Sequence, residues 1–444
     1  MSMLQSLSGW STTTLGSLGR WGSGGTPNRS NLEYYKGGEI PWLVIGDLNE
    51  SVVTRSQTYI TASGVENSSA KLLQPGTLLI AMYGSIGKTA ITGIPCTTNQ
   101  AIAHCTPHPG VNLCYLHRAI QWLKPILIKQ GQGGAQQNIS QGILKEQTVP
   151  LAPELEQIRI ADKLDTVLTR VDAVNARLAR VAPLLKRFRQ SVLAAATSGR
   201  LTEDWRDEYQ PSSWQQTDVQ SVALVGTGST PLRSNPAFFA EQGTPWVTSA
   251  ATGSEHITAA SEFVTPEAIA AHRLKVYPAG TLLVAMYGEG KTRGQVAELD
   301  IAATINQACA AVVVDETKML RTFVKLALQA NYLQMRVLAE GGNQPNLNLS
   351  KVKGFPLPAP TIEEQAEIVR RVETLFAFAD RLEARLQAAR TAANRLTPAL
   401  LAKAFRGELV PQDPNDEPAA ELLKRLAASA PATTKRRGRP AKAA

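Results

Sequence analysis

The chain of 444 residues carries a formal net charge of +9, and 43% of its residues are hydrophobic. This length allows two to four domains, and the composition is that of a globular protein, which excludes a fibrous or wholly disordered chain. Four cysteines without a CxxC pair are too few for a secreted disulfide framework. No leader peptide and no run of 18 apolar residues is present, so we expect a cytoplasmic protein without membrane spans. The basic balance favours a polyanionic partner.

The first 150 residues mix short strand signals with loops. Residues 77–84 (TLLIAMYG) form an apolar run that ends at a glycine, which is typical of a buried strand that enters a turn. Residues 111–131 have helical periodicity and also end at a glycine, as a helix C-cap does. The proline-bounded run at 148–153 (TVPLAP) predicts an edge strand that leads into the next element.

A long helix is predicted over residues 154–201. Its apolar side chains recur at alternating steps of three and four, which is the a/d seam of a heptad helix. Pro183 lies inside this pattern, so we expect the helix to kink or break there. The seam positions are Leu164, Val167, Val171, Val174, Leu178, Val181, Leu185, Phe188 and Val192.

The second half of the chain repeats the first. The strand signal returns at 281–288 (TLLVAMYG), the helical run at 319–342 and the proline-bounded run at 355–360. The heptad helix returns at 362–409, with Pro398 inside it. We therefore predict an α+β fold in which two mixed α/β domains are separated by two long antiparallel coiled-coil helices, with an internal pseudo-two-fold repeat.

The repeat also predicts the domain boundaries. Each globular domain should be followed by its own helical region, and the Ala/Pro-rich basic end of the chain has the composition of a flexible tail. The predicted globular domains are 1–150 and 209–360, the helical regions are 151–208 and 361–412, and the tail is 413–444.

Three motifs suggest enzyme chemistry, but each lacks a required part. Residues 84–89 (GSIGKT) resemble a phosphate loop, yet Met82 stands where the first glycine of a Walker A motif belongs. Residues 222–228 contain a lone GxG without a following long helix, and no Asn-Pro-Pro-Tyr or Asp-Pro-Pro-Tyr motif of an amino-methyltransferase occurs. The histidines and cysteines of 96–117 lack a second pair at zinc-ligand spacing. We expect a non-enzymatic chain that holds no metal or cofactor itself.

The repeat has a consequence for DNA binding. About 40 residues of helix span roughly 60 Å, and a duplex advances about 34–36 Å per turn, so such a spacer could hold two domains on separate half-sites. Residues that both domains share cannot distinguish two different half-sites, so they should build the frame or bind phosphates. Sequence readout should lie where the copies diverge, at roughly 47–70 and 251–275.

Candidate DNA-binding side chains follow from the same comparison. Lysines suit phosphate contacts, whereas amide side chains suit either bases or the backbone. The shared pairs are Tyr83/Tyr287, Lys88/Lys291, Thr89/Thr292, Gln100/Gln307 and Asn138/Asn346. Further candidates are Arg29, Arg55, Gln137, Arg233, Arg293 and Gln344.

The basic tail contains a motif of its own. Arg437-Gly438-Arg439, flanked by basic residues and followed by proline, has the core of an AT-hook, whose arginines enter a narrow A·T minor groove. A merely solvated basic tail explains the same residues equally well.

Together these motifs resemble the specificity subunits of type I restriction-modification systems. The resemblance rests on the GGTP-to-PW opening (24–42 and 228–246), the two AMYG segments with their GKT loops, the Asn-Gln-Ala pairs, the GGAQQNIS segment (133–140), and the VPLAP-x-x-EQ run that leads into the helix. It covers both copies up to about residue 418 and leaves out the tail.

The resemblance implies that 1–150 and 209–360 are target recognition domains, that 151–208 and 361–412 are the central and distal conserved regions, and that the chain has no catalytic site. In the family, the subunit reads an asymmetric bipartite site and binds two methyltransferase subunits, which methylate adenine N6 with S-adenosylmethionine. Through these it binds two restriction subunits that use ATP and Mg²⁺. We expect the helices to dock the partners, with the candidates Leu164, Val171, Leu178, Leu185, Leu375, Leu382, Leu386 and Leu396.

Three alternatives remain open. A modification-only or type IIB/IIG-like system would use the same subunit without a motor endonuclease. A nucleotide-binding enzyme built on the GKT loop would turn over ATP by itself. A coiled-coil adaptor would bind no bipartite duplex even at low salt.

Overall fold

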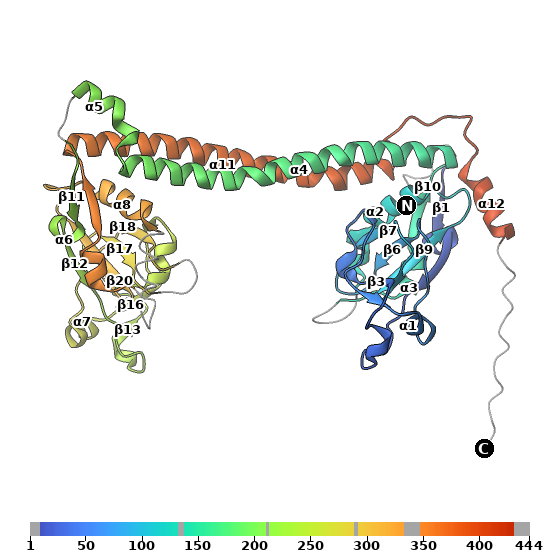
Figure 1. Cartoon of the computed structure of the whole chain (residues 1–444), viewed down its shortest axis with the longest axis horizontal. Helices are drawn as coiled ribbons and strands as arrows, with labels where there is room; N and C mark the ends of the chain where they lie inside the picture. The colour runs from blue at the N-terminus through green and yellow to red at the C-terminus, as the bar shows by residue number, and fades with distance from the viewer. Residues whose placement is uncertain (1–8, 132–136, 210–212, 288–291, 333–346, 430–444) are drawn as a thin grey trace, which may run out of the picture. The chain divides into compact units, whose positions relative to one another are not determined.

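The computed structural model describes residues 9–131, 137–209, 213–287, 292–332 and 347–429. The chain divides into two compact units (Figure 1). Unit 1 combines residues 1–177 with 389–444, and unit 2 is residues 178–388. Each unit therefore joins one globular domain to one part of each long helix, α4 (Glu154–Thr197) and α11 (Ile362–Ala404).

A five-stranded sheet forms the centre of the globular domain in unit 1. Its strand order is β2 (Gly19–Ser23), β9 (Ile102–Pro107), β6 (Leu78–Ala81), β7 (Thr89–Thr92) and β4 (Val52–Val53). All neighbours are antiparallel except β4 and β7, which run parallel. Every residue of β6 is buried, as the apolar run predicts.

Smaller elements complete this domain. Strand β1 pairs with β10, and β3 pairs with both β5 and β8. The remaining bounds are β1 (Ser11–Thr14), β3 (Ile40–Leu43), β5 (Tyr59–Ile60), β8 (Thr97–Thr98), β10 (Thr148–Leu151), α1 (Ala62–Glu66), α2 (Leu113–Lys129), α3 (Gln141–Glu146), and the 3₁₀ turns η2 (Leu15–Leu18), η3 (Leu32–Tyr34) and η4 (Ile45–Asp47).

The core of unit 1 combines residues that lie far apart in the sequence. Leu164 of α4 and Leu401 of α11 belong to the same buried cluster as the side chains of α2. The ring of Phe405, just after α11, stacks on Trp122 at 5.2 Å and tilts against Tyr115 at 5.3 Å between centroids. The end of the second long helix is thus part of the first domain's core.

A last helix, α12 (Ala419–Ser429), closes unit 1. The backbone N–H of Ala419 donates to the carbonyl of Gly9 at 2.8 Å, and Leu422 is buried in the unit 1 core. Ahead of the helix, Asp416 forms a 2.5 Å ion pair with Arg159 of α4. The segment after α11 is therefore anchored next to the first described residues.

Unit 2 repeats the architecture. Its five-stranded sheet has the order β12 (Ala223–Thr227), β20 (Cys309–Val314), β17 (Leu282–Ala285), β18 (Val296–Leu299) and β15 (His256–Ile257). The other bounds are β11 (Gln215–Asp218), β13 (Phe239–Ala240), β14 (Thr244–Val247), β16 (Glu262–Val264), β19 (Thr304–Ile305), β21 (Pro356–Ala359), α5 (Glu203–Tyr209), α6 (Val219–Val222), α7 (Pro266–His272), α8 (Arg321–Ala330), α10 (Leu349–Lys353), η5 (Arg200–Thr202), η6 (Pro236–Phe238) and η7 (Ser249–Gly253).

The two long helices pack against each other in antiparallel fashion. In unit 2, Leu185 of α4 shares a buried cluster with Ala379 and Leu386 of α11. Arg189 of α4 donates to Asp380 of α11 at 2.5 Å across the same seam. The heptad pattern and the antiparallel arrangement are confirmed within this unit.

Both helices continue through their prolines, so the expected break is wrong. Pro183 lies inside α4 and Pro398 inside α11. A proline removes one helix N–H donor, but the packed turns on either side hold the backbone. Leu185, two residues after Pro183, is only 9% exposed, and Leu401, three residues after Pro398, is only 4% exposed. Within one turn of each proline, the helix is therefore fixed in a core.

The predicted α+β fold with its internal repeat is confirmed. The proline-bounded runs form β10 and β21, each in a two-stranded sheet, as edge strands should. Of the second helical run, α8 covers Arg321–Ala330, and residues 333–342 lie outside the described residues. No helix in the described part of the chain combines the length and hydropathy needed to cross a bilayer.

Candidate nucleic-acid interface

Three polar segments meet at the end of β6 in unit 1. The N–H of Met82 donates to the carbonyl of Ala101 at 2.8 Å, and the N–H of Ile139 donates to the carbonyl of Met82 at 2.9 Å. Tyr83 forms an isolated β-bridge with Asn138. Tyr83 is 37% exposed, and Gln137 and Asn138 are also exposed. The strand end thus brings separate shared motifs onto one surface.

The same arrangement recurs in unit 2. The N–H of Met286 donates to the carbonyl of Ala308 at 2.7 Å, and the N–H of Leu347 donates to the carbonyl of Met286 at 3.2 Å. Tyr287 is 37% exposed, like its counterpart. The predicted partners Gln344 and Asn346 lie outside the described residues.

A threonine–glutamine pair joins this surface in each unit. The hydroxyl of Thr26 donates to Oε1 of Gln100, and the hydroxyl of Thr230 donates to Oε1 of Gln307 at 2.5 Å. Both glutamines are exposed, and with the carbonyl oxygen taken by threonine each amide presents N–H donors. We name Thr26, Tyr83, Gln100, Gln137 and Asn138 the polar face of unit 1. The role of the threonines was missed, although they stand in the repeated GGTP and GSTP motifs.

The two GKT loops do not occupy equivalent positions. The N–H of Ala81 donates to the carbonyl of Lys88, whereas the equivalent N–H of Ala285 donates to the carbonyl of Gln295. The preceding glycines, Gly87 (φ +74°) and Gly294 (φ +82°), share the left-handed conformation that favours glycine. Structurally, Lys88 therefore corresponds to Gln295.

The predicted pairs Lys88/Lys291 and Thr89/Thr292 are consequently wrong. Thr89 begins β7, and its counterpart in β18 is Val296, because Ile80 pairs with Thr89 as Val284 pairs with Val296. Thr292 and Arg293 lie in the longer second loop, and Lys291 lies outside the described residues. The repeated letters Gly-Lys-Thr do not mark a shared site.

Thr89 also cannot contact DNA, because it is fully buried. Its hydroxyl donates to Oε2 of Glu50 at 2.7 Å and lies 2.9 Å from Nε2 of His117. Lys124 donates to Oε1 of the same carboxylate at 2.7 Å. Burial would raise the pKa of Glu50, but the hydrogen bonds from Lys124 and Thr89 outweigh burial and hold the pKa below its ordinary value. Burial lowers the pKa of His117 to about 4, so this imidazole is neutral near pH 7.

Unit 2 has a different ionic cluster at the corresponding place. Glu298 of β18 lies 3.0 Å from Nε of Arg321 and 3.4 Å from Nζ of Lys325. Nζ of Lys325 also lies 3.1 Å from Nε2 of His256. The backbone frame is therefore common to both units, while its polar interior is not.

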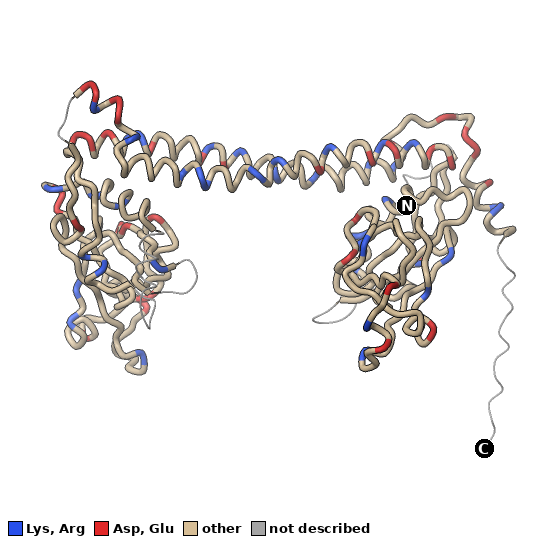
Figure 2. The backbone as a smooth tube through the Cα atoms, viewed as in Figure 1, with Lys and Arg blue, Asp and Glu red and all other residues tan. Residues whose placement is uncertain are grey.

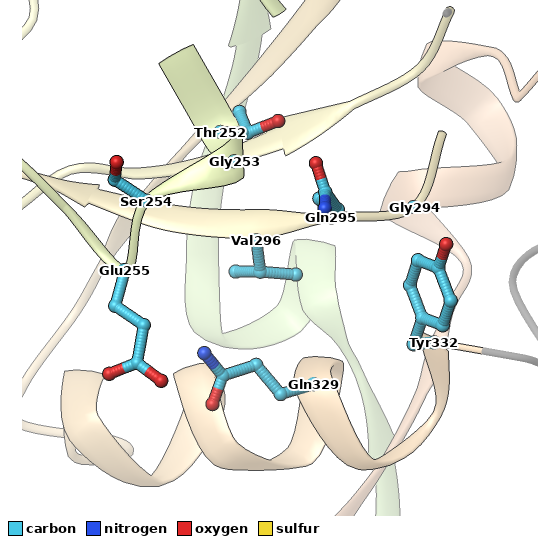
Figure 3. A pocket seen from close by; sticks show the side chains of 9 residues that line it. All are labelled: Thr252, Gly253, Ser254, Glu255, Gly294, Gln295, Val296, Gln329 and Tyr332. Atoms are coloured by element: carbon cyan, nitrogen blue, oxygen red, sulfur yellow. The ribbon is translucent and has the colours of Figure 1, made fainter. Parts of the chain in front are cut away.

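A cavity opens beside the β6–β7 turn of unit 1 and recurs beside the β17–β18 turn of unit 2. The first, of about 400 Å³, is lined by Glu50, Lys88, Lys124 and Gln137 among others. The second, of about 310 Å³, has Gln295 on one wall and Tyr332 beside it, with Gln329 rising from α8 below (Figure 3). Sequence comparison named Lys88 and Gln137 but missed Gln295, because the lengths of the two loops differ.

The arginine candidates differ in availability. Arg29 and Arg55 are exposed. Arg233 donates to both carboxylate oxygens of Glu262, at 2.7 and 3.0 Å, and its guanidinium lies over aromatic rings of the same domain. Arg293 is partly buried, and its Nε finds no acceptor among the described residues. Arg29 and Arg55 are thus the candidates that are open to a phosphate.

Most predicted docking side chains are used within the chain. Leu164, Val171, Leu185 and Leu386 are at most 9% exposed, so their expected role in docking is wrong. The half-buried seam residues are Leu178, Leu375 and Leu382. Leu396 is 45% exposed, and Val174, another seam position, is 46% exposed. The apolar helix surface that is open to a partner therefore includes some positions of the predicted seam and excludes the buried ones.

The cysteine and histidine cluster is part of the fold. Burial raises the pKa of the Cys96 thiol to about 11 and that of Cys105 to about 12, so neither forms a ready thiolate ligand. In the described part of the chain, no three His, Cys, Asp or Glu side chains are grouped as metal ligands. The AT-hook residues Arg437, Gly438 and Arg439 lie outside the described residues.

Both copies of the repeat match a known family. The model of the type I restriction modification DNA specificity domain matches residues 7–182 and 211–389. The chain belongs to this family. It is therefore a type I specificity subunit, whose role is DNA recognition in a restriction-modification system.

Relatives and solved structures agree with this assignment. The specificity subunit is 30% identical over 382 residues to that of type I restriction enzyme EcoBI from Escherichia coli, a match that covers 80% of each chain. It is 26% identical over 443 residues to the StySPI specificity subunit of Salmonella potsdam, covering 95% of each. The HsdS subunit from Thermoanaerobacter tengcongensis shares its fold, with 17% identity, a TM-score of 0.59, and coverage of 90% of this chain and 97% of that one. A structure solved to explain assembly and conformational transition of the type I system reaches a TM-score of 0.74 at 17% identity, covering 90% and 99%.

Proposed function

We propose that each unit binds one half of an asymmetric bipartite DNA site, with the duplex held by its polar face, which in unit 2 comprises Thr230, Tyr287 and Gln307 among the described residues. The recurrence of this face carries the proposal. Tyr83 and Tyr287 have the same exposure, and Gln100 and Gln307 are held by equivalent threonines. Because both units present these groups in the same geometry, the groups suit contacts that do not depend on sequence, such as those to phosphates. The net charge of +9 favours the approach of DNA.

Matched substitutions test this proposal. The specificity subunit is purified with its methyltransferase partner and offered a library of randomised duplexes, and the modified adenines are mapped by sequencing. We expect two short motifs separated by an unspecified spacer. Gln100→Ala and Gln307→Ala should each weaken binding several-fold without changing the recognised bases. A single uninterrupted motif would contradict the two-unit proposal.

The helices are the proposed docking surface for the methyltransferase subunits. Leu184 of α4 is 56% exposed and Phe378 of α11 is 48% exposed, although both lie on helices with a buried seam. Figure 2 marks Lys and Arg positions along the backbone of these helices, and no acidic residue occurs between 173 and 202 of the sequence. Apolar anchors with a polar rim are typical of protein interfaces. Partner subunits would then supply S-adenosylmethionine, ATP and Mg²⁺.

The tail is proposed to add a contact to an A·T minor groove. Helix α12 is fixed on unit 1, so the eight residues from Ser429 to Arg437 can reach at most about 29 Å from that anchor. Removal of residues 430–444 should weaken binding to sites flanked by A·T pairs and leave binding to G·C-flanked sites unchanged. Equal losses on both duplexes would indicate a merely solvated basic tail.

A further inference from the structure

The cavities beside the two turns are built on one backbone frame. Gly87 and Gly294 take the same left-handed conformation. The carbonyl of the residue after each glycine accepts a hydrogen bond from the last residue of the preceding strand, which is β6 in unit 1 and β17 in unit 2. On the helix side of the cavities, the N–H of Asn112 donates to Gln157 at 2.9 Å and the N–H of Leu320 donates to Gln365 at 2.8 Å. Because these glutamines are equivalent, the start of α2 corresponds to the start of α8. Wall positions on the equivalent strands and on the matched parts of α2 and α8 can therefore be assigned their counterparts.

The side chains at matched wall positions differ in hydrogen-bonding character. Lys88 corresponds to Gln295, and on the helix side Lys124 of α2 lines the unit 1 cavity while Tyr332, just after the end of α8, lines the unit 2 cavity. At these positions the unit 1 cavity has two cationic donors, one of them paired with Glu50, and the unit 2 cavity has neutral groups that can both donate and accept, beside the carboxylate of Glu255. A common frame with different polar walls is what two readers of different half-sites require.

The unit 1 cavity is also held in place by a strained residue. Glu50 is not a glycine but has φ +59°, a conformation that costs free energy and persists where the surroundings fix it. Its carboxylate holds Lys124 at 2.7 Å. Nζ of Lys88 lies 3.4 Å from the carbonyl of Ile45, a long contact for an ammonium group with three donors.

The position of the cavity places it next to the polar face. Gln137 belongs both to that face and to the cavity wall, and the turn that carries Lys88 begins directly after Tyr83. A duplex bound by the polar face would therefore lie beside the cavity. Shared groups would hold the duplex while the divergent groups contact the base edges.

We propose that each cavity reads a base of its own half-site, unit 1 through Lys88 and unit 2 through Gln295. This inference rests on the proposed function. The acceptor atoms O6 and N7 of guanine suit the lysine, and the N6 and N7 edge of adenine suits the glutamine. Lys124, fixed by Glu50, is a positioning residue that keeps the unit 1 cavity cationic and disfavours the amino groups of adenine and cytosine.

Reciprocal substitutions test the inference in the full complex with the methyltransferase. Binding to randomised duplexes is measured for Lys88→Gln and Gln295→Lys at several salt concentrations, with Lys129→Gln on the exposed face of α2 as the control. Lys88→Gln should reduce the preference for guanine at one position of one half-site by on the order of tenfold to a hundredfold. Gln295→Lys should change one position of the other half-site, and the control should change neither.

The outcomes separate this inference from the proposed function. If Lys88→Gln weakens all sequences equally and lowers the salt slope by about one ion, Lys88 binds a phosphate and the inference is overturned. Unchanged preferences in both variants overturn it as well. If the unsubstituted complex shows no bipartite motif, the proposed function itself fails. Thermal unfolding of each variant establishes that a change in preference is not due to loss of the fold.

Discussion

Two buried glutamates at the starts of the long helices should respond in opposite ways to the same substitution. Glu156 is 1% exposed and accepts a hydrogen bond from Trp10 at 3.0 Å, while Glu364 is 0% exposed and accepts one from Trp214 at 2.8 Å. Glu364 also accepts from Arg206 at 2.6 Å and from Thr202 at 2.7 Å. In contrast, Oε1 of Glu156 is buried and has no partner among the described residues.

The expected magnitudes follow from these contacts. Removing one partner of a buried ion pair costs about 3–5 kcal/mol, and because Arg206 is 25% exposed, we expect about 2–3 kcal/mol for Glu364→Gln. For a unit of this size, this corresponds to a fall of about 4–12 °C in the unfolding temperature of unit 2. Glu156→Gln keeps an acceptor for Trp10 and removes a poorly solvated charge. It should leave the stability of unit 1 unchanged or raise it by about 1 kcal/mol.

The pH dependence gives a second criterion. Burial raises the pKa of Glu156 above its ordinary value. A carboxyl whose pKa is raised by folding stabilises the folded state below its unfolded pKa and loses this contribution as the pH rises through the folded pKa. The advantage of Glu156→Gln should therefore be present at pH 7 and fade as the pH falls towards 4.

Scanning calorimetry of the full chain measures both variants, with the exposed neighbours Glu154→Gln and Glu363→Gln as controls. The reasoning is refuted if the two buried variants lose similar stability, or if Glu156→Gln is the more damaging one.

Further predictions concern the helices, the divergent segment and the buried histidine. Leu184→Asp or Phe378→Asp should abolish co-purification with the methyltransferase and leave the unfolding temperature within about 1 °C of the unsubstituted chain. In contrast, Leu185→Asp in the buried seam should unfold the helix pair. An intact complex with Leu184→Asp and with Phe378→Asp would refute the docking surface. Replacement of 47–70 by the segment of a relative should alter one half-site alone, as seen by mapping modified adenines, and an unchanged site would place readout elsewhere. Between pH 6.5 and 4, the unfolding free energy of the unsubstituted chain should fall by up to about 3 kcal/mol more than that of the His117→Gln variant. The reason is that His117 binds a proton in the unfolded chain but stays neutral in the folded one. Parallel curves of unfolding free energy against pH would contradict this.

The elements with strong local periodicity were predictable from the sequence. The steps of three and four over 154–201 follow from helix geometry, and the apolar runs at 77–84 and 281–288 follow from strands buried on both faces. The internal repeat supplied the arrangement, since a helix that occurs twice with a seam can pack against its own copy.

The candidate site was only partly predictable, because its register depends on backbone contacts. Three residues separate Tyr83 from Gly87, whereas six separate Tyr287 from Gly294. Alignment of the two sequence repeats pairs the GKT triplets. The hydrogen bond from the last residue of β6 to Lys88, and its counterpart from β17 to Gln295, pair Lys88 with Gln295 instead. The heptad pattern likewise cannot show which seam positions find a partner, and Val174 remains 46% exposed.

The mixed origin of unit 1 has a consequence for the order of folding during synthesis. Unit 2 is one continuous segment, 178–388, so all of its contacts become possible once that segment has left the ribosome. Unit 1 needs Phe405 for its aromatic core, and this residue follows Arg177 by 228 residues, which take roughly 10–45 s to synthesise. The first domain to be made is therefore the last to be completed. During that interval, the apolar surface of Tyr115 and Trp122 that Phe405 later covers stays exposed, and the nascent chain is most open to aggregation and to chaperones.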